Sequence, residues 1–131
     1  MVLSIELKML LYSVILGIVQ LLIATQAITA QRGMAWNISA RDQKMPELTG
    51  LAGRLDRVFK NFKETFVFFA AAIVMVQITT MANPTSALGA QIYFWARLIY
   101  IPVYAAGIPI LRSLIWLVSL IGLIMVLSVL F

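Results

Sequence analysis

The composition of this 131-residue chain is that of a membrane protein, because 63% of its residues are apolar and its mean hydropathy is +1.00, whereas roughly 45–50% apolar residues is usual in soluble domains. The lack of Cys and His excludes thiolate nucleophiles, disulfides, imidazole bases and a plausible zinc or other metal site. The net charge of +5 does not indicate nucleic acid, because no soluble basic domain exists to bind it.

The apolar residues fall into four segments, each long enough for a helix to cross a hydrocarbon core of about 30 Å. They predict helices at about residues 5–31, 49–81, 86–106 and 109–131, with a loop at about 32–48. Helices are expected rather than strands, because the apolar runs are too long for strands and do not alternate. Pro84 and the pair Gly107 and Pro109 mark the two short turns. The prediction is an all-α integral membrane protein with one four-helix domain.

The basic residues indicate how the chain crosses the membrane. Of the ten Lys and Arg residues, Arg97 lies inside the third segment and Lys8 inside the first, where it disagrees with the others about orientation. The rest lie in the loop, at the start of the second helix or beside the last turn: Arg32, Arg41, Lys44, Arg54, Arg57, Lys60, Lys63 and Arg112. The turn around Pro84 has none. Because cytoplasmic loops are enriched in Lys and Arg, we expect both termini on the non-cytoplasmic side of a multi-pass protein.

The start of the second helix carries two polar faces. At about 100° per residue, one arc holds Arg54, Arg57, Asn61 and Glu64, and the other holds Asp56, Lys60 and Lys63. The stretch 65–82 is uncharged and about 27 Å long as a helix, which nearly spans the membrane by itself. The charged turns therefore have two interpretations, a solvated helix end or a binding face.

Arg97 lies near the middle of the third segment, where an isolated Arg costs a few to more than ten kcal/mol. It needs a partner, and we predict a pair with Glu64. The pair would join two helices, organise a ligand site, or do both. Tyr100 and Tyr104 follow Arg97 on the same helical face.

The cytoplasmic half thus collects excess positive charge, several hydrogen-bond donors and one carboxylate, a set that suits a small polyanion carrying an amine. Its members are Arg54, Arg57, Asn61, Glu64, Arg97, Tyr100, Tyr104 and Arg112.

The spacing Arg54-x-x-Arg57-x-x-x-Asn61-x-x-Glu64 resembles the signature of the family of membrane-associated proteins in eicosanoid and glutathione metabolism (MAPEG). Arg97, Tyr100, Tyr104 and Arg112 stand where that family has a second cluster. The runs "NISARD" and "GLAGRLDRVFKNF" resemble its bacterial branch, which implies a bacterial inner membrane. The likeness covers essentially the whole chain.

The resemblance implies a homotrimer that holds glutathione, as co-substrate, between neighbouring subunits near the cytoplasmic face. The glutathione carboxylates would meet Arg54, Arg57 and Arg112, and its amine would meet Glu64 or Asn61. Arg97, Tyr100 and Tyr104 complete the site, and Arg32 would reach the ligand from the first helix. Arg112 and Ser113 are the catalytic candidates, because a charge or hydrogen bond beside the sulfur stabilises its thiolate. An apolar electrophile or lipid hydroperoxide would arrive from the membrane.

Three functions remain open. The first is a detoxifying glutathione transferase or peroxidase. The second is a non-catalytic trimeric scaffold that binds lipid or a partner protein, because a fold alone does not establish activity. The third is a small proton-driven multidrug exporter, which needs a titratable carboxylate inside the membrane; Glu6 lies near a helix end, and Glu64 is surrounded by cations.

Overall fold

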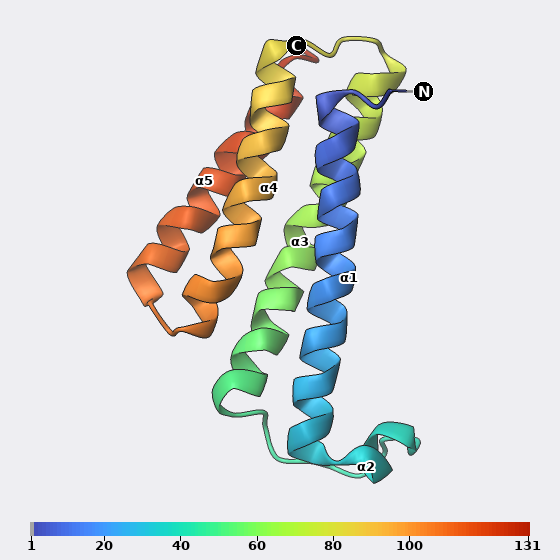
Figure 1. Ribbon diagram of the computed structural model, residues 1–131, viewed down its shortest axis with the longest axis vertical. Coiled ribbons are helices and arrows are strands. Elements are labelled where there is room, and N and C mark those ends of the chain that lie inside the picture. The colour runs from blue at the N-terminus through green and yellow to red at the C-terminus, as the bar shows by residue number, and fades with distance from the viewer. Residues whose placement is uncertain (1) are drawn as a thin grey trace.

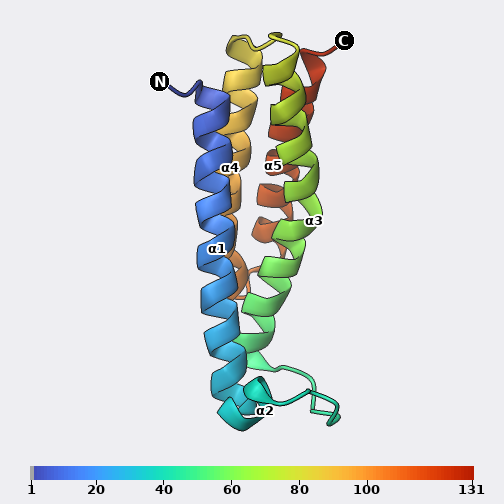
Figure 2. The same ribbon diagram turned by 90° about the vertical axis from the view of Figure 1, so that its right-hand side faces the viewer.

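The computed structural model describes residues 2–131, and the regular secondary structure in this range is all helical. Its elements are α1 (Ile5–Arg32), α2 (Met34–Ile38), α3 (Gly50–Ile78), α4 (Pro84–Ala105) and α5 (Pro109–Ser128). The four long helices run along the long axis (Figure 1). The α3–α4 turn and both ends of the chain lie together at what we call the terminal end (Figures 1 and 2). The opposite end, which holds α2 and the α4–α5 turn, is the loop end.

The outer surface of the bundle is suited to lipid. Helices α1, α3 and α5 are long and apolar enough to cross a membrane, and large side chains such as Leu22, Phe68 and Ile124 are 56%, 64% and 56% exposed on them. Helix α4 has a comparable length, but Gln91 and Arg97 lower its hydropathy. The protein is therefore an integral membrane protein with several spanning helices.

The helix boundaries differ from the predicted ones where local capping decides them. Helix α4 starts at Pro84, two residues before the predicted start, because the Asn83 side chain accepts hydrogen bonds from the Thr85 and Ser86 amides. The Ser86 hydroxyl in turn accepts one from the Asn83 amide at 2.9 Å. This reciprocal cap, with proline at the first helical position, satisfies the helix start.

Two further differences concern helix ends and the loop. Helix α3 stops at Ile78, three residues early, and Thr80 follows with a positive φ of 55°. Helix α5 stops at Ser128, also three residues before the predicted end. The predicted loop contains the short helix α2, which the sequence pattern did not indicate.

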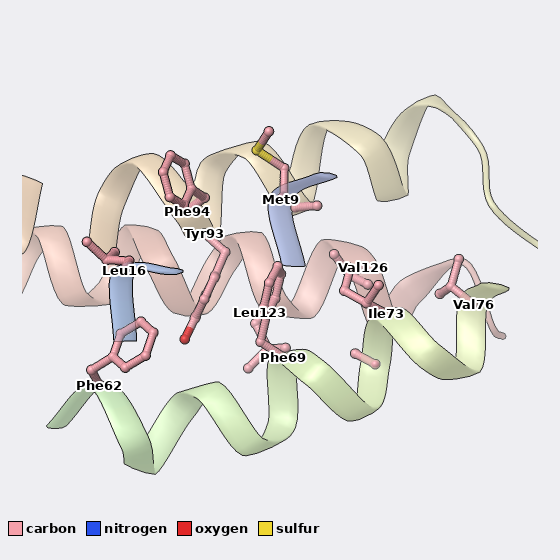
Figure 3. Packing of buried hydrophobic residues seen from close by; sticks show 12 residues of the cluster. Met9, Leu16, Phe62, Phe69, Ile73, Val76, Tyr93, Phe94, Leu123 and Val126 are labelled. Atoms are coloured by element: carbon pink, nitrogen blue, oxygen red, sulfur yellow. The ribbon is translucent and has the colours of Figure 1, made fainter. Parts of the chain in front are cut away.

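The core lies where α3 packs against α4 and α5, with α1 closing one side (Figure 3). The Phe69 and Tyr93 rings stack with centroids 4.0 Å apart, and the Tyr93 hydroxyl lies 2.9 Å from the Thr65 hydroxyl. The buried hydroxyl groups therefore satisfy each other. Other core members are Met9, Leu16, Phe62, Ala72, Ile73, Val76, Ala90, Phe94, Leu123 and Val126.

Helices α4 and α5 touch backbone to backbone at Gly89 and Gly122. A Cβ atom at Gly89 would lie 2.6 Å from the Gly122 carbonyl oxygen, which is inside van der Waals contact. Small residues of this kind allow membrane helices to approach closely. The α4–α5 hairpin is therefore built on this contact.

Replacing Gly89 with alanine should destabilise the protein by about 1–3 kcal/mol, because the two backbones must move apart. Gly17→Ala is the matched control: its Cβ would meet only the far edge of the Phe62 ring, at 3.0 Å, and alanine gains up to about 1 kcal/mol of helix propensity. Unfolding of both variants is measured in the same detergent. Equal stability of Gly89→Ala and the parent protein would contradict the tight contact.

Candidate anion-binding site

Three arginines converge at the loop end, where α3 begins, α4 ends and α5 begins. Arg54 and Arg57 come from the first turns of α3, and Arg112 comes from the first turn of α5. Together with Tyr104, Gly107 and Pro109 they line a pocket of about 300 Å³. The two short-range features that the sequence indicated, a charged helix start and a Gly-Pro turn, are thus brought together.

A second pocket, of about 260 Å³, adjoins the first along α3. Arg57, Tyr104 and Arg112 line both pockets. The second one adds Lys60, Asn61, Glu64 and Tyr100. We call the two pockets and their lining residues the arginine site. It contains every residue of the arc that was predicted on this helix, namely Arg54, Arg57, Asn61 and Glu64. Lys60, which the prediction assigned to the other arc, also reaches it.

Tyr104 holds two of the arginines in place. The Arg57 Nε–H donates to the Tyr104 hydroxyl at 3.0 Å, and the Arg112 guanidinium carbon lies 4.8 Å from the centre of the Tyr104 ring. The third arginine is fixed by the backbone, because Arg54 Nη1 donates to the Ala105 carbonyl at 3.1 Å. Gly107 has a φ of 78°, and a Cβ there would approach Arg54 Cζ to 3.2 Å. Glycine suits this turn both by its conformation and by the space it leaves.

The three arginines of this site form no ion pair within the described residues. Among residues 2–131, no carboxylate oxygen lies within 4.0 Å of a nitrogen of Arg54, Arg57 or Arg112, and the ion pair that does form joins Asp56 and Lys60 at 2.9 Å. Guanidinium groups bind carboxylates through paired, charge-assisted hydrogen bonds. The arrangement therefore favours a ligand with more than one anionic group.

The predicted pair of Arg97 with Glu64 is wrong in this structure. Arg97 is 1% exposed, and its Nη2 donates to Asn61 Oδ1 at 2.8 Å, whereas no Glu64 oxygen lies within 4.0 Å of it. The reason is that Glu64 lies at the exposed edge of α3, while Asn61, nearly one turn earlier, is half-buried. The acceptor for the buried cation is therefore a neutral amide.

Arg97 stands behind the arginine site and lines neither of its pockets. Its guanidinium carbon lies 4.4 Å from the centre of the Tyr100 ring, and Nε and Nη1 have no hydrogen-bond partner. Because the Asn61 oxygen accepts from Arg97, the amide NH₂ of Asn61 is the group left for a ligand. Arg97 thus orients a lining residue from the protein interior.

Arg32 lies in a different pocket of about 260 Å³, on the α1 and α2 side of α3. Its Nη2 donates to the Pro46 carbonyl at 3.2 Å, and its guanidinium carbon lies 4.8 Å from the centre of the Trp36 ring. Lys60 is the one residue that this pocket shares with the arginine site in the described chain. One subunit therefore does not bring Arg32 together with Arg57 and Arg112.

Ser113 is exposed, and its hydroxyl donates to the Pro109 carbonyl of its own helix at 3.2 Å. It lines neither pocket of the arginine site. Sequence reasoning missed the hydrogen bond between Asn61 and Arg97. The sequence did offer a clue to this hydrogen bond, because both residues lie on helix faces that were already identified as polar.

Comparison with known proteins identifies the family of this chain. A search among curated proteins found no match. The model of the MAPEG family, however, matches residues 9–131, which is nearly the full chain. The protein therefore belongs to the MAPEG family, whose members are glutathione-dependent membrane transferases and peroxidases.

Proposed function

We propose that this protein is a glutathione-dependent membrane enzyme, a transferase or peroxidase that acts on apolar electrophiles or lipid hydroperoxides. The observation that carries the proposal is the convergence of Arg54, Arg57 and Arg112 on joined pockets, where none of the three forms an ion pair within residues 2–131. Glutathione has two carboxylates and one ammonium group. The arginines supply the matching cations, and Glu64, at the edge of the second pocket, supplies the matching carboxylate.

The two pockets suggest how the ligand would lie. The carboxylates would bind Arg54, Arg57 and Arg112, and the ammonium group would bind Glu64. The free amide NH₂ of Asn61 would donate to a ligand carbonyl, and Tyr100 and Tyr104 would form the walls. The tripeptide would thus extend along the first turns of α3, parallel to the helix.

The chemistry requires a thiolate, because the thiolate is the nucleophilic form of glutathione. Arg112 borders both pockets, and a guanidinium beside the sulfur stabilises its negative charge and lowers the thiol pKa. Ser113, the other catalytic candidate, would have to turn from the Pro109 carbonyl to serve. We therefore assign thiolate stabilisation to Arg112. In a transferase, the thiolate would bond to an electrophilic carbon of a substrate from the lipid and expel the leaving group as an anion. In a peroxidase, it would attack the O–O bond of a lipid hydroperoxide and release the alcohol, and a second glutathione would reduce the resulting sulfenic acid to the disulfide and water.

The position of Arg32 is relevant to how the subunits assemble. Its pocket lies across α3 from the arginine site, so a ligand bound to Arg57 would contact Arg32 only if a neighbouring subunit presented it. This separation supports a site between subunits, and membership of the family supports a homotrimer as the assembly. The loop end, with its basic residues, would face the cytoplasm, and the bacterial inner membrane is the proposed location.

The experiment that tests this function measures the thiolate itself. Ultraviolet difference absorption of the detergent-purified protein should show bound thiolate when glutathione is added. Arg112→Leu should bind glutathione more weakly, and it should lack this absorption even at a glutathione concentration that saturates the variant in a calorimetric titration. The non-catalytic scaffold makes the opposite prediction. Saturating glutathione that gives no thiolate absorption in the parent protein would favour the scaffold.

A further inference from the structure

A buried carboxylate lies at the terminal end, far from the arginine site. Glu6 is 3% exposed and accepts a hydrogen bond from the Ser86 hydroxyl. Among residues 2–131, no Lys or Arg nitrogen lies within 4.0 Å of it. Buried carboxylates are normally paired with a cation. Within the described residues, Glu6 therefore has a hydrogen-bond partner but no cation beside it.

Glu6 lines a pocket of about 530 Å³ between the starts of α1 and α4. Asn83 and Gln91 add amide groups, and the rim is apolar, with Ile5 and Leu88 45% and 52% exposed. A cation could thus reach Glu6 from the lipid side. The pocket combines one buried carboxylate with a partly apolar mouth, which suits an amphipathic ligand.

A separate apolar groove lies farther along the same seam between α1 and α4. It has a volume of about 340 Å³, and the residues that line it are Tyr12, Ile15, Leu16, Val19, Phe94 and Leu98. Both helices run from the terminal end toward the loop end (Figures 1 and 2). At 1.5 Å per residue, the groove therefore extends from about 9 to about 20 Å below Glu6, a depth comparable with half of a hydrocarbon core of about 30 Å.

We propose that the seam between α1 and α4 binds a phospholipid with a primary ammonium headgroup, with the ammonium on Glu6 and one acyl chain in the groove. A primary ammonium has three hydrogen-bond donors, which match the two oxygens of the Glu6 carboxylate and the side-chain oxygen of Gln91. The Asn83 side-chain oxygen is not available, because it already accepts from the Thr85 and Ser86 amides. Quaternary ammonium groups are recognised by aromatic rings, and none of the described residues that line the Glu6 pocket is aromatic. The ligand is therefore of the phosphatidylethanolamine class rather than the choline class.

Native mass spectrometry of the detergent-purified protein, mixed with equal amounts of dioleoyl phosphatidylethanolamine and dioleoyl phosphatidylcholine, tests the proposal. The parent protein should prefer the ethanolamine lipid by roughly tenfold or more, as expected for a charge-assisted hydrogen bond. Glu6→Gln keeps an acceptor for Ser86 but removes the charge, so it should lose the preference. The control Glu47→Gln, in the exposed loop, should keep it. Equal binding of both lipids by the parent, or an unchanged preference in Glu6→Gln, would overturn the proposal.

A second pair of variants leaves the Glu6–Ser86 hydrogen bond intact. Leu88→Trp fills the mouth of the pocket and should abolish the preference, whereas Leu117→Trp, at a residue of similar exposure on α5 (47%), should not. Soluble glycerophosphoethanolamine, which has the headgroup without acyl chains, should not displace the lipid at equal concentration. Displacement would show that a free amine occupies the pocket and would refute the role of the groove.

Discussion

Replacing Asn61 with leucine should lower the free energy of unfolding by about 3 kcal/mol or more. The reason is that Asn61 Oδ1 accepts the hydrogen bond that Arg97 donates at 2.8 Å, while the other guanidinium nitrogens of Arg97 already lack partners. A buried charge left without its acceptor carries most of its desolvation penalty. Unfolding of the parent and the variant in one detergent, followed by circular dichroism, measures the difference.

The matched control is Glu64→Gln, one turn along the same face of α3. Glu64 is exposed and does not pair with Arg97, so this change should alter stability by less than about 1 kcal/mol, as usual for a solvated charge. If Glu64→Gln destabilised the protein as much as Asn61→Leu, the pair predicted from the sequence would be right and the hydrogen bond with Asn61 secondary.

Replacing Arg57 with alanine should weaken glutathione binding by roughly tenfold to more than a hundredfold. Arg57 borders both pockets of the arginine site, and a charge-assisted hydrogen bond contributes about 1.5–3 kcal/mol, where each 1.4 kcal/mol is about a factor of ten in affinity. Calorimetric titration at one ionic strength gives the two dissociation constants.

Lys63→Ala is the control for charge alone. Lys63 is exposed, its Nζ lies 4.6 Å from the centre of the Phe59 ring, and it does not line the arginine site. Losing this screened charge should change the affinity by less than about threefold. Comparable affinities for Arg57→Ala and Lys63→Ala would mean that the charged start of α3 is a solvated helix end and not a binding face.

The sequence was informative where the signal is local. Long apolar runs and turn residues such as Pro84 and Gly107 act over a few residues, so the helices were predictable to within about three residues. The arc of Arg54 and Arg57 follows from helical periodicity in the same way.

The partner of Arg97 was not predictable, because Asn61 and Glu64 share one face of α3 and differ by less than one turn. Which of them meets Arg97 depends on how far α3 is rotated and shifted against α4, and packing at residues such as Phe69 and Tyr93 sets that. The surroundings of Arg32 and Glu6 were not predictable for the same reason. The pattern locates a charge along a helix, but the neighbouring helices decide whether it is buried and into which pocket it points.

The close contact of Gly89 with Gly122 has a consequence for the biogenesis of the protein. Helix α4 carries Gln91 and Arg97, which would be costly to expose to lipid in a helix that entered the bilayer alone. A turn of only three residues, 106–108, joins it to the strongly apolar α5, and the two glycines let the backbones meet without a gap. The two helices are thus suited to leave the translocon as one hairpin, in which α5 carries its more polar neighbour into the membrane.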